Sequence, residues 1–287
     1  MNISQVIIQA TEQLAIYLNN QTSAAQEARW LLAHLLNVES STLLAHSKRE
    51  LSEVELSAYT ALLDGRIRRH KPLAYILGTA PFCELTIKVR PPFLIPRHET
   101  EELVMHLVAL LKPYRNLCIL DLCTGTGAIA LALARHLPDA TIVGSDISAE
   151  ALTLAEENRQ ALGLQNISFI RSDLYEHIPQ RFFDLIISNP PYLSQQEWEE
   201  LPPDVKEWES PLALVGGDDG FAAYETIISN AHKHLTGRFT GTEIPQLVLE
   251  HGAEQQQGLE QYLHAAGFTS NVLWKDSFGK DRAILAR

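Results

Sequence analysis

The sequence predicts an α/β protein with a mostly parallel sheet, preceded by a small all-α domain. Three features lead to this prediction. Apolar residues recur at helical spacing through residues 1–77, two short alternating runs lie in a proline-rich stretch at 78–98, and strand-like and helix-like stretches alternate from residue 117 onward. Such alternation indicates βαβ units with right-handed crossovers, and therefore parallel strands. The 287 residues suffice for one large or two ordinary domains.

The first 77 residues are predicted to form a helical bundle. Five apolar residues between 23 and 36 share one helical face, and Ser23 is placed to cap that helix. Residues 52–67 repeat the pattern, with Ser52 and Glu55 at the spacing of a capping box. No cluster of titratable residues stands out here, so we interpret residues 1–77 as a substrate-positioning domain rather than a catalytic one.

Residues 78–98 hold four of the chain's fourteen prolines. The two short runs of alternating apolar and polar residues in this stretch predict a β-hairpin, stiffened by proline. This hairpin would link the bundle to a second domain at 99–287.

The second domain contains five apolar runs that we predict to be strands, at 117–121, 141–145, 167–170, 183–188 and 246–250. Helical stretches lie between most of them; one of these spans 148–164, where Ser148 can cap the start and Gly163 can end the helix. Residues 267–276 and 281–287, separated by a short turn with a glycine, are expected to pair as an antiparallel hairpin. Together these segments predict a seven-stranded sheet.

The composition is that of a globular protein, with 46% hydrophobic and 20% charged residues. The N-terminal residues lack the pattern of a signal peptide, and no apolar run approaches the roughly 18 residues of a membrane span. Cys83, Cys118 and Cys123 form no CxxC motif, so they are interpreted as ordinary thiols of a reducing compartment, with no metal site. We therefore expect a cytoplasmic protein, and nothing in the sequence indicates more than a monomer.

The charge is spread unevenly. Residues 1–115 are near neutral, whereas residues 116–287 hold 11 Lys or Arg and 24 Asp or Glu, a net charge of −13. The chain thus lacks the electrostatic footprint of a duplex-DNA-binding protein, and no direct nucleic-acid binding is expected. The one basic cluster, residues 66–71, is interpreted as the solvated C-terminal end of a helix.

A glycine-containing loop follows the first predicted strand of the second domain. It matches G-x-G-x-x-A, in which Gly125 and Gly127 allow a tight turn and a close approach of ligand to a helix N-terminus. The next strand ends at Asp146, 19 residues beyond Gly127, where a carboxylate can accept hydrogen bonds from ribose hydroxyls. Asp173, at the end of the third strand, could meet an adenine amino group. These residues predict an adenosine-containing cofactor, and both NAD and S-adenosylmethionine fit.

The fourth strand distinguishes the two cofactors, because residues 184–193 read DLIISNPPYL. A planar NH2 group is a poor nucleophile, since its lone pair is delocalised. The side-chain oxygen of Asn189 and the carbonyl of Pro190 can hold its two N–H groups, Pro191 fixes the backbone, and Tyr192 offers a face for stacking. This set contains no nucleophile and no dedicated base. It suits in-line methyl transfer from a sulfonium, where positioning supplies most of the acceleration, and so favours S-adenosylmethionine.

With these motifs in place, the sequence resembles the HemK/PrmC family of release-factor glutamine N5-methyltransferases over nearly its whole length. SNPPY by itself is shared with nucleic-acid amino-methyltransferases, whereas the LIPRHET stretch is far more specific to the family. The matching stretches are PLAYILG (72–78), FLIPRHETEELV (93–104), CTGTGAIALALA (123–134), VGSDIS (143–148), SNPPY (188–192), WESPLALVGGDDG (208–220) and KDRAILAR (280–287).

The resemblance implies a class I (Rossmann-like) methyltransferase that uses S-adenosyl-L-methionine to methylate the glutamine of the GGQ motif in class 1 peptide-chain release factors. It places the cofactor at Cys123, Thr124, Gly125, Thr126, Gly127, Asp146, Asp173, Leu174 and Asn189. It places catalysis and the substrate amide at Asn189, Pro190, Pro191 and Tyr192. The chain departs from the family pattern at Cys123, where glycine is frequent, at Leu174, where an aromatic residue is frequent, and at the longer turn 236–246.

Two other functions remain open at this stage. An N6-adenine or N2-guanine nucleic-acid methyltransferase would use the same SNPPY chemistry, but would need a positively charged surface to hold a flipped base. A catalytically silent S-adenosylmethionine-binding module is the second alternative, and an intact SNPPY argues against it.

Overall fold

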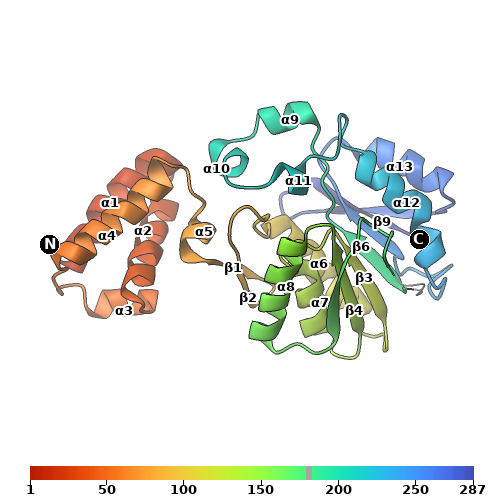
Figure 1. The fold of residues 1–287 in the computed structure, drawn as a ribbon, viewed down its shortest axis with the longest axis horizontal. Coiled ribbons are helices and arrows are strands. Elements are labelled where there is room, and N and C mark those ends of the chain that lie inside the picture. The colour runs from red at the N-terminus through yellow and green to blue at the C-terminus, as the bar shows by residue number, and fades with distance from the viewer. Residues whose placement is uncertain (179–182) are drawn as a thin grey trace. The chain divides into compact units, whose positions relative to one another are not determined.

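The computed structural model describes residues 1–178 and 183–287, which form two compact units (Figure 1). The smaller unit comprises Met1–Gly78 and Pro202–Trp208, and the larger unit comprises Thr79–Leu201 and Glu209–Arg287. The hairpin expected to be a linker therefore groups with the larger unit, and a short segment from the second half of the chain groups with the helical one.

The smaller unit is entirely helical. Its core consists of apolar side chains from the first helices, such as Leu14, Leu31 and Leu32, all fully buried. The predicted capping box of Ser52 and Glu55 is confirmed. The helices are α1 (Ile3–Leu18), α2 (Gln21–Leu36), α3 (Ser40–Ala45), α4 (Glu53–Ile67), α5 (Leu73–Leu77) and α10 (Pro203–Lys206).

One prediction for this unit is wrong, and a second holds only in part. Helix α2 begins at Gln21, because the side chain of Asn20, and not that of Ser23, accepts a hydrogen bond and caps it. The basic cluster is not uniformly solvated either. Arg66 is buried and forms an ion pair with Glu27 at 2.8 Å, a partner from another helix that local sequence could not indicate.

The larger unit is built on a seven-stranded sheet with the order β5-β4-β3-β6-β7-β9-β8. The first five strands in this order are parallel, and β9 is antiparallel to both of its neighbours, so the predicted α/β fold with a closing hairpin is confirmed. The strands are β3 (Cys118–Leu122), β4 (Thr141–Asp146), β5 (Ile167–Arg171), β6 (Leu185–Ser188), β7 (Leu247–Glu250), β8 (Asn271–Lys275) and β9 (Asp281–Ala286). A separate antiparallel hairpin is formed by β1 (Thr79–Phe82) and β2 (Leu85–Lys88).

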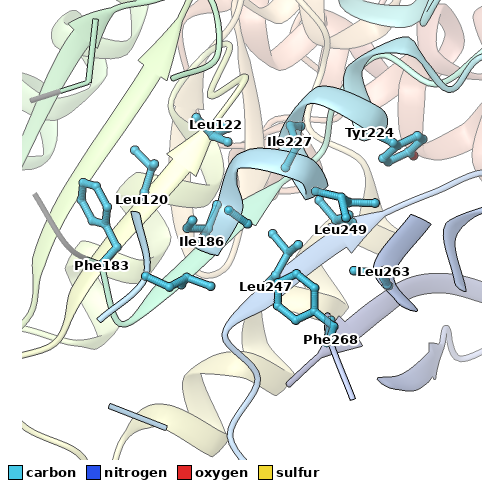
Figure 2. Close-up of a cluster of buried hydrophobic side chains, with 14 of the residues drawn as sticks. Leu120, Leu122, Phe183, Ile186, Tyr224, Ile227, Leu247, Leu249, Leu263 and Phe268 are labelled. Carbon is cyan, nitrogen blue, oxygen red and sulfur yellow. The ribbon is translucent and has the colours of Figure 1, made fainter. Parts of the chain in front are cut away.

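Helices cover both faces of this sheet. Leu120 and Leu122 of β3 pack into one core cluster with Tyr224 and Ile227 of α12, as Figure 2 shows. Asp121 lies between these two leucines and so points to the other face, where it accepts a hydrogen bond from the amide of Ala130 in α7. The helices of this unit are α6 (His98–Leu111), α7 (Ala128–His136), α8 (Ala149–Leu162), α9 (Gln195–Glu199), α11 (Pro211–Leu214), α12 (Ala222–His234) and α13 (Gln256–Ala265).

Full burial of each large apolar side chain in such a cluster contributes about 1.5–3 kcal/mol. The sheet is therefore a rigid frame on which the ends of its strands are held in fixed positions. Among residues 1–178 and 183–287, no helix combines the length and the apolar character that crossing a membrane requires.

Candidate active site

A cavity of about 860 Å³ opens at the carboxyl ends of the parallel strands, entirely within the larger unit. Parallel α/β sheets bind their ligands at this edge. Nine of the twelve residues predicted from the sequence line it: Cys123, Thr124, Gly125, Thr126, Asp146, Asp173, Leu174, Asn189 and Pro191. Gly127, Pro190 and Tyr192 do not line it.

The glycine loop joins β3 to α7. Its backbone folds back on itself through a hydrogen bond from the amide of Gly127 to the carbonyl of Thr124, at 2.9 Å. Gly127 has φ +82°, and a Cβ atom there would lie 3.1 Å from side-chain atoms of Ala155, Leu131 and Phe169. This glycine therefore serves the close packing of loop and helix, and the first residues of α7 are left facing the cavity.

Two of the positions at which the chain departs from the pattern of the family it resembles share an unusual backbone conformation. Cys123 has φ +59° and Leu174 has φ +44°, both in the left-handed region that side chains adopt at a cost. Burial raises the pKa of the Cys123 thiol well above its usual range, so the thiol stays protonated.

The Cys123→Gly variant is expected to be more stable than the parent chain. Relief of the left-handed strain, about 1–2 kcal/mol, outweighs the roughly 0.5–1 kcal/mol that glycine loses in chain entropy, so the melting temperature should rise by about 2 °C. Cys118→Gly is the control, because Cys118 lies within β3 and has no left-handed strain to relieve. A fall in melting temperature for both variants would show that Cys123 is not strained.

Asp146 is held at the end of β4 by two backbone amides. Its Oδ2 accepts from Gly125 at 2.8 Å and its Oδ1 accepts from Ser148 at 2.9 Å. Burial raises the pKa of this carboxyl, and the same backbone amides oppose the rise. Each oxygen keeps a second lone pair, so the carboxylate can still accept hydrogen bonds from a pair of hydroxyls in the cavity.

The Asn-Pro-Pro-Tyr turn after β6 is fixed from several sides. The hydroxyl of Ser188 donates to the carbonyl of Leu122 at 2.8 Å and ties the ends of two neighbouring strands together. The amides of Tyr192 and Leu193 donate to the carbonyl of Leu214, at 3.1 and 2.8 Å. Gln255 donates to the carbonyl of Tyr192 at 2.8 Å. The turn is thus stiffened by its surroundings as well as by its prolines.

The ring of Tyr192 packs against the core cluster beneath the turn. Burial raises its pKa to about 12, so the hydroxyl stays neutral. The structure describes contacts of this ring with the core cluster, which support the turn. The stacking of Tyr192 on a substrate stays a prediction.

The side-chain amide of Asn189 has a defined orientation. Its Nδ2 donates to Glu250 Oε1 at 2.9 Å and lies 3.5 Å from Thr100 Oγ1. Its Oδ1 makes no hydrogen bond within the described residues and is not among their buried unpaired atoms. The carbonyl of Pro190 is likewise not used by any donor in the described parts of the chain. Both acceptors predicted from the sequence are therefore uncommitted.

The sequence did not assign a role to two segments that wall the cavity, residues 90–97 and 210–213. They are joined by a hydrogen bond from the amide of Ser210 to the carbonyl of Pro92, at 2.7 Å. Beside them Arg97 pairs with the buried carboxylate of Glu209 at 2.6 Å. The resemblance of residues 93–104 and 208–220 to the family was the signal that could have indicated a role in the site. The proline-rich composition of residues 78–98 suggested only a linker.

Comparison with known proteins identifies the family. The family described as Methyltransferase small domain matches residues 98–201, and the one described as PrmC N-terminal domain matches residues 7–78. The release factor glutamine methyltransferase of Geobacter sulfurreducens is 36% identical over 92% of this chain and 90% of its own length. That of Thermodesulfovibrio yellowstonii is 32% identical over 97% of this chain and 98% of its own. The chain belongs to the release factor glutamine methyltransferase family.

Solved structures agree with the class I fold expected for this family. A methyltransferase from Pyrococcus furiosus, 15% identical, has a TM-score of 0.50 and covers 70% of this chain and 88% of its own. The hMettl16 catalytic domain in complex with the MAT2A 3'UTR hairpin 6 is 14% identical, with a TM-score of 0.56 and 81% of each chain covered. At these identities the likeness concerns the fold alone, and the function follows from the family.

Proposed function

We propose that this chain transfers a methyl group from S-adenosyl-L-methionine to the side-chain amide nitrogen, N5, of the glutamine in the GGQ motif of class 1 peptide-chain release factors. Membership of the release factor glutamine methyltransferase family supports the reaction and the substrate. The observation that carries the assignment is a pair of uncommitted acceptors: Asn189 Oδ1, on a residue that lines the cavity, and the carbonyl of the next residue, Pro190, which does not itself line it.

The cavity has the size and the donor set that S-adenosylmethionine needs. Its volume lies within the roughly 300–1,000 Å³ typical of small-molecule sites. Asp146 would hold the ribose hydroxyls, Asp173 the adenine amino group, and Leu174 with Ile147 would flank the adenine ring. When bound, this cofactor supplies a methyl group already activated on a positively charged sulfur.

The protein's own contribution is positioning. Asn189 Oδ1 and the Pro190 carbonyl would each accept one N–H of the glutamine amide, which fixes the plane of the NH2 group. The nitrogen lone pair, perpendicular to that plane, is then aimed along the cavity. Orientation of this kind can supply about 7–11 kcal/mol of the barrier reduction. No base is required before transfer, because the methylated amide nitrogen is strongly acidic and loses its proton readily.

The test is a transfer assay with a radiolabelled methyl donor. We expect a purified class 1 release factor to be labelled, and the same factor with its GGQ glutamine replaced to remain unlabelled. Nucleic acids rich in unpaired adenine and guanine form the second arm of the assay. Label on the nucleic acid would support the alternative nucleic-acid methyltransferase, and absence of label on every substrate would contradict the proposed function.

Further parts of the proposal concern organisation and location. We assign positioning of the release factor to the helical residues 1–77 and catalysis to residues 99–287. Release factors act on the ribosome, so the proposed location is the cytoplasm. The proposed enzyme is a monomer that contacts its protein substrate and does not bind nucleic acid directly.

Replacing Asp146 with alanine is expected to weaken S-adenosylmethionine binding by about 10- to 100-fold, because hydrogen bonds to a charged group contribute roughly 1.5–3 kcal/mol. Isothermal titration calorimetry measures the effect. Asp139→Ala is the matched control, since Asp139 is an exposed acid paired with Arg115 outside the cavity. An unchanged dissociation constant for Asp146→Ala would remove the ribose assignment.

A further inference from the structure

Glu250 is a buried acid that touches the proposed site without lining it. It is the last residue of β7, only 5% exposed, and its Oε1 accepts from Asn189 Nδ2 at 2.9 Å. The residues that line the cavity include Asn189 but not Glu250. Because Glu250 does not line the cavity, it would act on a substrate amide indirectly, and Asn189 is a lining residue that it holds by a hydrogen bond.

Glu250 is not half of an ion pair within the described residues. The nearby guanidinium of Arg282 pairs with Asp276 at 2.8 Å and Glu99 at 3.2 Å, and that of Arg97 pairs with Glu209. Glu250 Oε2 has no hydrogen-bond partner in the described part of the chain. Burial raises the pKa of Glu250 to about 7, which shows how poorly this environment solvates its charge. A buried carboxyl in such an environment does not stabilise the folded chain, so its presence is explained better by a functional role.

The backbone of Glu250 is held rigidly. The buried hydroxyl of Tyr224 donates to its carbonyl at 2.7 Å. Strand β7 lies between β6 and β9, with Leu249 opposite Ser188 and Glu250 opposite Ala283. Glu250 therefore offers a fixed acceptor directly beside the start of the Asn-Pro-Pro-Tyr turn.

We propose that Glu250 is a positioning residue that locks the side-chain amide of Asn189 with Nδ2 turned toward the protein and Oδ1 turned toward the cavity. An asparagine amide has nearly the same shape after a half-turn, so packing alone does not choose its orientation. The turned amide would present N–H groups to the N–H groups of the substrate, and would set Oδ1 against an oxygen of Glu250. Thr100 Oγ1, 3.5 Å from the same Nδ2, can accept a hydrogen bond from it and is therefore compatible with this orientation. This inference rests on the proposed function of Asn189.

The decisive variants are Glu250→Met and Glu250→Gln. Methionine fills the space without an acceptor, whereas glutamine keeps a carbonyl that can receive Asn189 Nδ2. Replacing a buried acid that has no ion pair within the described residues by an apolar side chain of similar volume is compatible with folding. Gln246→Met is the control: it also removes a buried polar group, one that immediately precedes the first residue of β7 and does not line the 860 Å³ cavity.

Glu250→Met is expected to lower kcat for release-factor methylation by about 10-fold or more, with the dissociation constant of S-adenosylmethionine and the melting temperature little changed. Glu250→Gln should stay within about threefold of the parent, and Gln246→Met should match the parent. Equal loss in the Met and Gln variants, or parent-like turnover in the Met variant, would overturn the proposal.

A double-mutant cycle distinguishes positioning from a general structural effect. In an Asn189→Ala background, Glu250→Met should cause no further loss, because Glu250 acts only through Asn189. Additive losses would contradict this. The cycle is informative only if the parent chain labels the release factor, so failure of the function itself is detected first and separately.

Discussion

The Asn189→Ala variant is expected to methylate a release factor about 100- to 1,000-fold more slowly than the parent chain, with little change in its affinity for S-adenosylmethionine. The loss arises because alanine removes one of the two acceptors that orient the substrate amide, and removing a preorganised hydrogen-bonding group of this kind costs about that factor. Cofactor affinity is largely spared because, apart from Asn189 itself, the proposed cofactor contacts lie on β3, β4 and β5 and the loops that follow them.

Two further variants sharpen this experiment. Asn271→Ala, at an exposed position at the start of β8, should keep the parent activity. Asn189→Asp keeps an acceptor but places a second carboxylate against Glu250 Oε1, so it should also be severely impaired. Single-turnover rates and cofactor titrations on each protein give the comparison. Similar turnover in the parent and in Asn189→Ala would sink the role assigned to this residue.

The sheet was predictable because each strand carries its own signal. The runs expected at 141–145 and 167–170 appear as Thr141–Asp146 and Ile167–Arg171. Strand β4 is buried over most of its length and reads as a nearly continuous apolar segment, whereas β5, at the edge of the sheet, is only partly buried and mixes apolar with polar residues. The cofactor-site residues that end a strand, such as Asp146, were also predictable from the sequence. The carboxyl ends of parallel strands meet at one edge, so a residue that ends one strand is placed near those that end its neighbours.

Residues that act across the sheet were not predictable. Thr100 is 89 residues and Glu250 is 61 residues from Asn189 in the sequence. The three residues come together because β7, which ends at Glu250, pairs with β6, and because α6 carries Thr100 to this edge of the sheet. A single sequence contains no local signal for that adjacency. The N-cap of α2 was missed for a smaller reason: Asn20 and Ser23 are both residue types that cap helices well, and the helix begins after the earlier one.

Support of the Asn-Pro-Pro-Tyr turn by residues 210–220 was also hidden in the sequence, although GG at 216–217 marks it in retrospect. A Cβ atom on Gly216 would lie 2.3 Å from the carbonyl oxygen of Pro191 and 2.9 Å from that of Gly220. Backbone atoms cannot move aside as a flexible side chain can. The segment can approach the turn this closely only because Gly216 has no side chain.

Gly216→Ala is therefore expected to reduce methylation by about 100-fold and to destabilise the chain by about 1–3 kcal/mol. The added methyl must push the segment or the turn apart, and overpacking costs about this much. A displacement near 1 Å at the adjacent Pro190 carbonyl is enough for the loss of rate, because it spoils the alignment of the amide. Steady-state assays with a release factor, together with denaturant unfolding, measure the two effects.

Gly65→Ala is the matched control for this substitution. Gly65 lies in α4 without left-handed strain, and a Cβ atom there meets nothing within 4 Å. Alanine is the better helix former, so this variant should gain up to about 1 kcal/mol in stability and keep its activity. If Gly216→Ala loses stability but retains full turnover, the turn does not need its present position for catalysis. The role of the turn as a rigid amide holder would then have to be abandoned, because a methyl group in contact with the Pro191 carbonyl must disturb any geometry that the turn imposes.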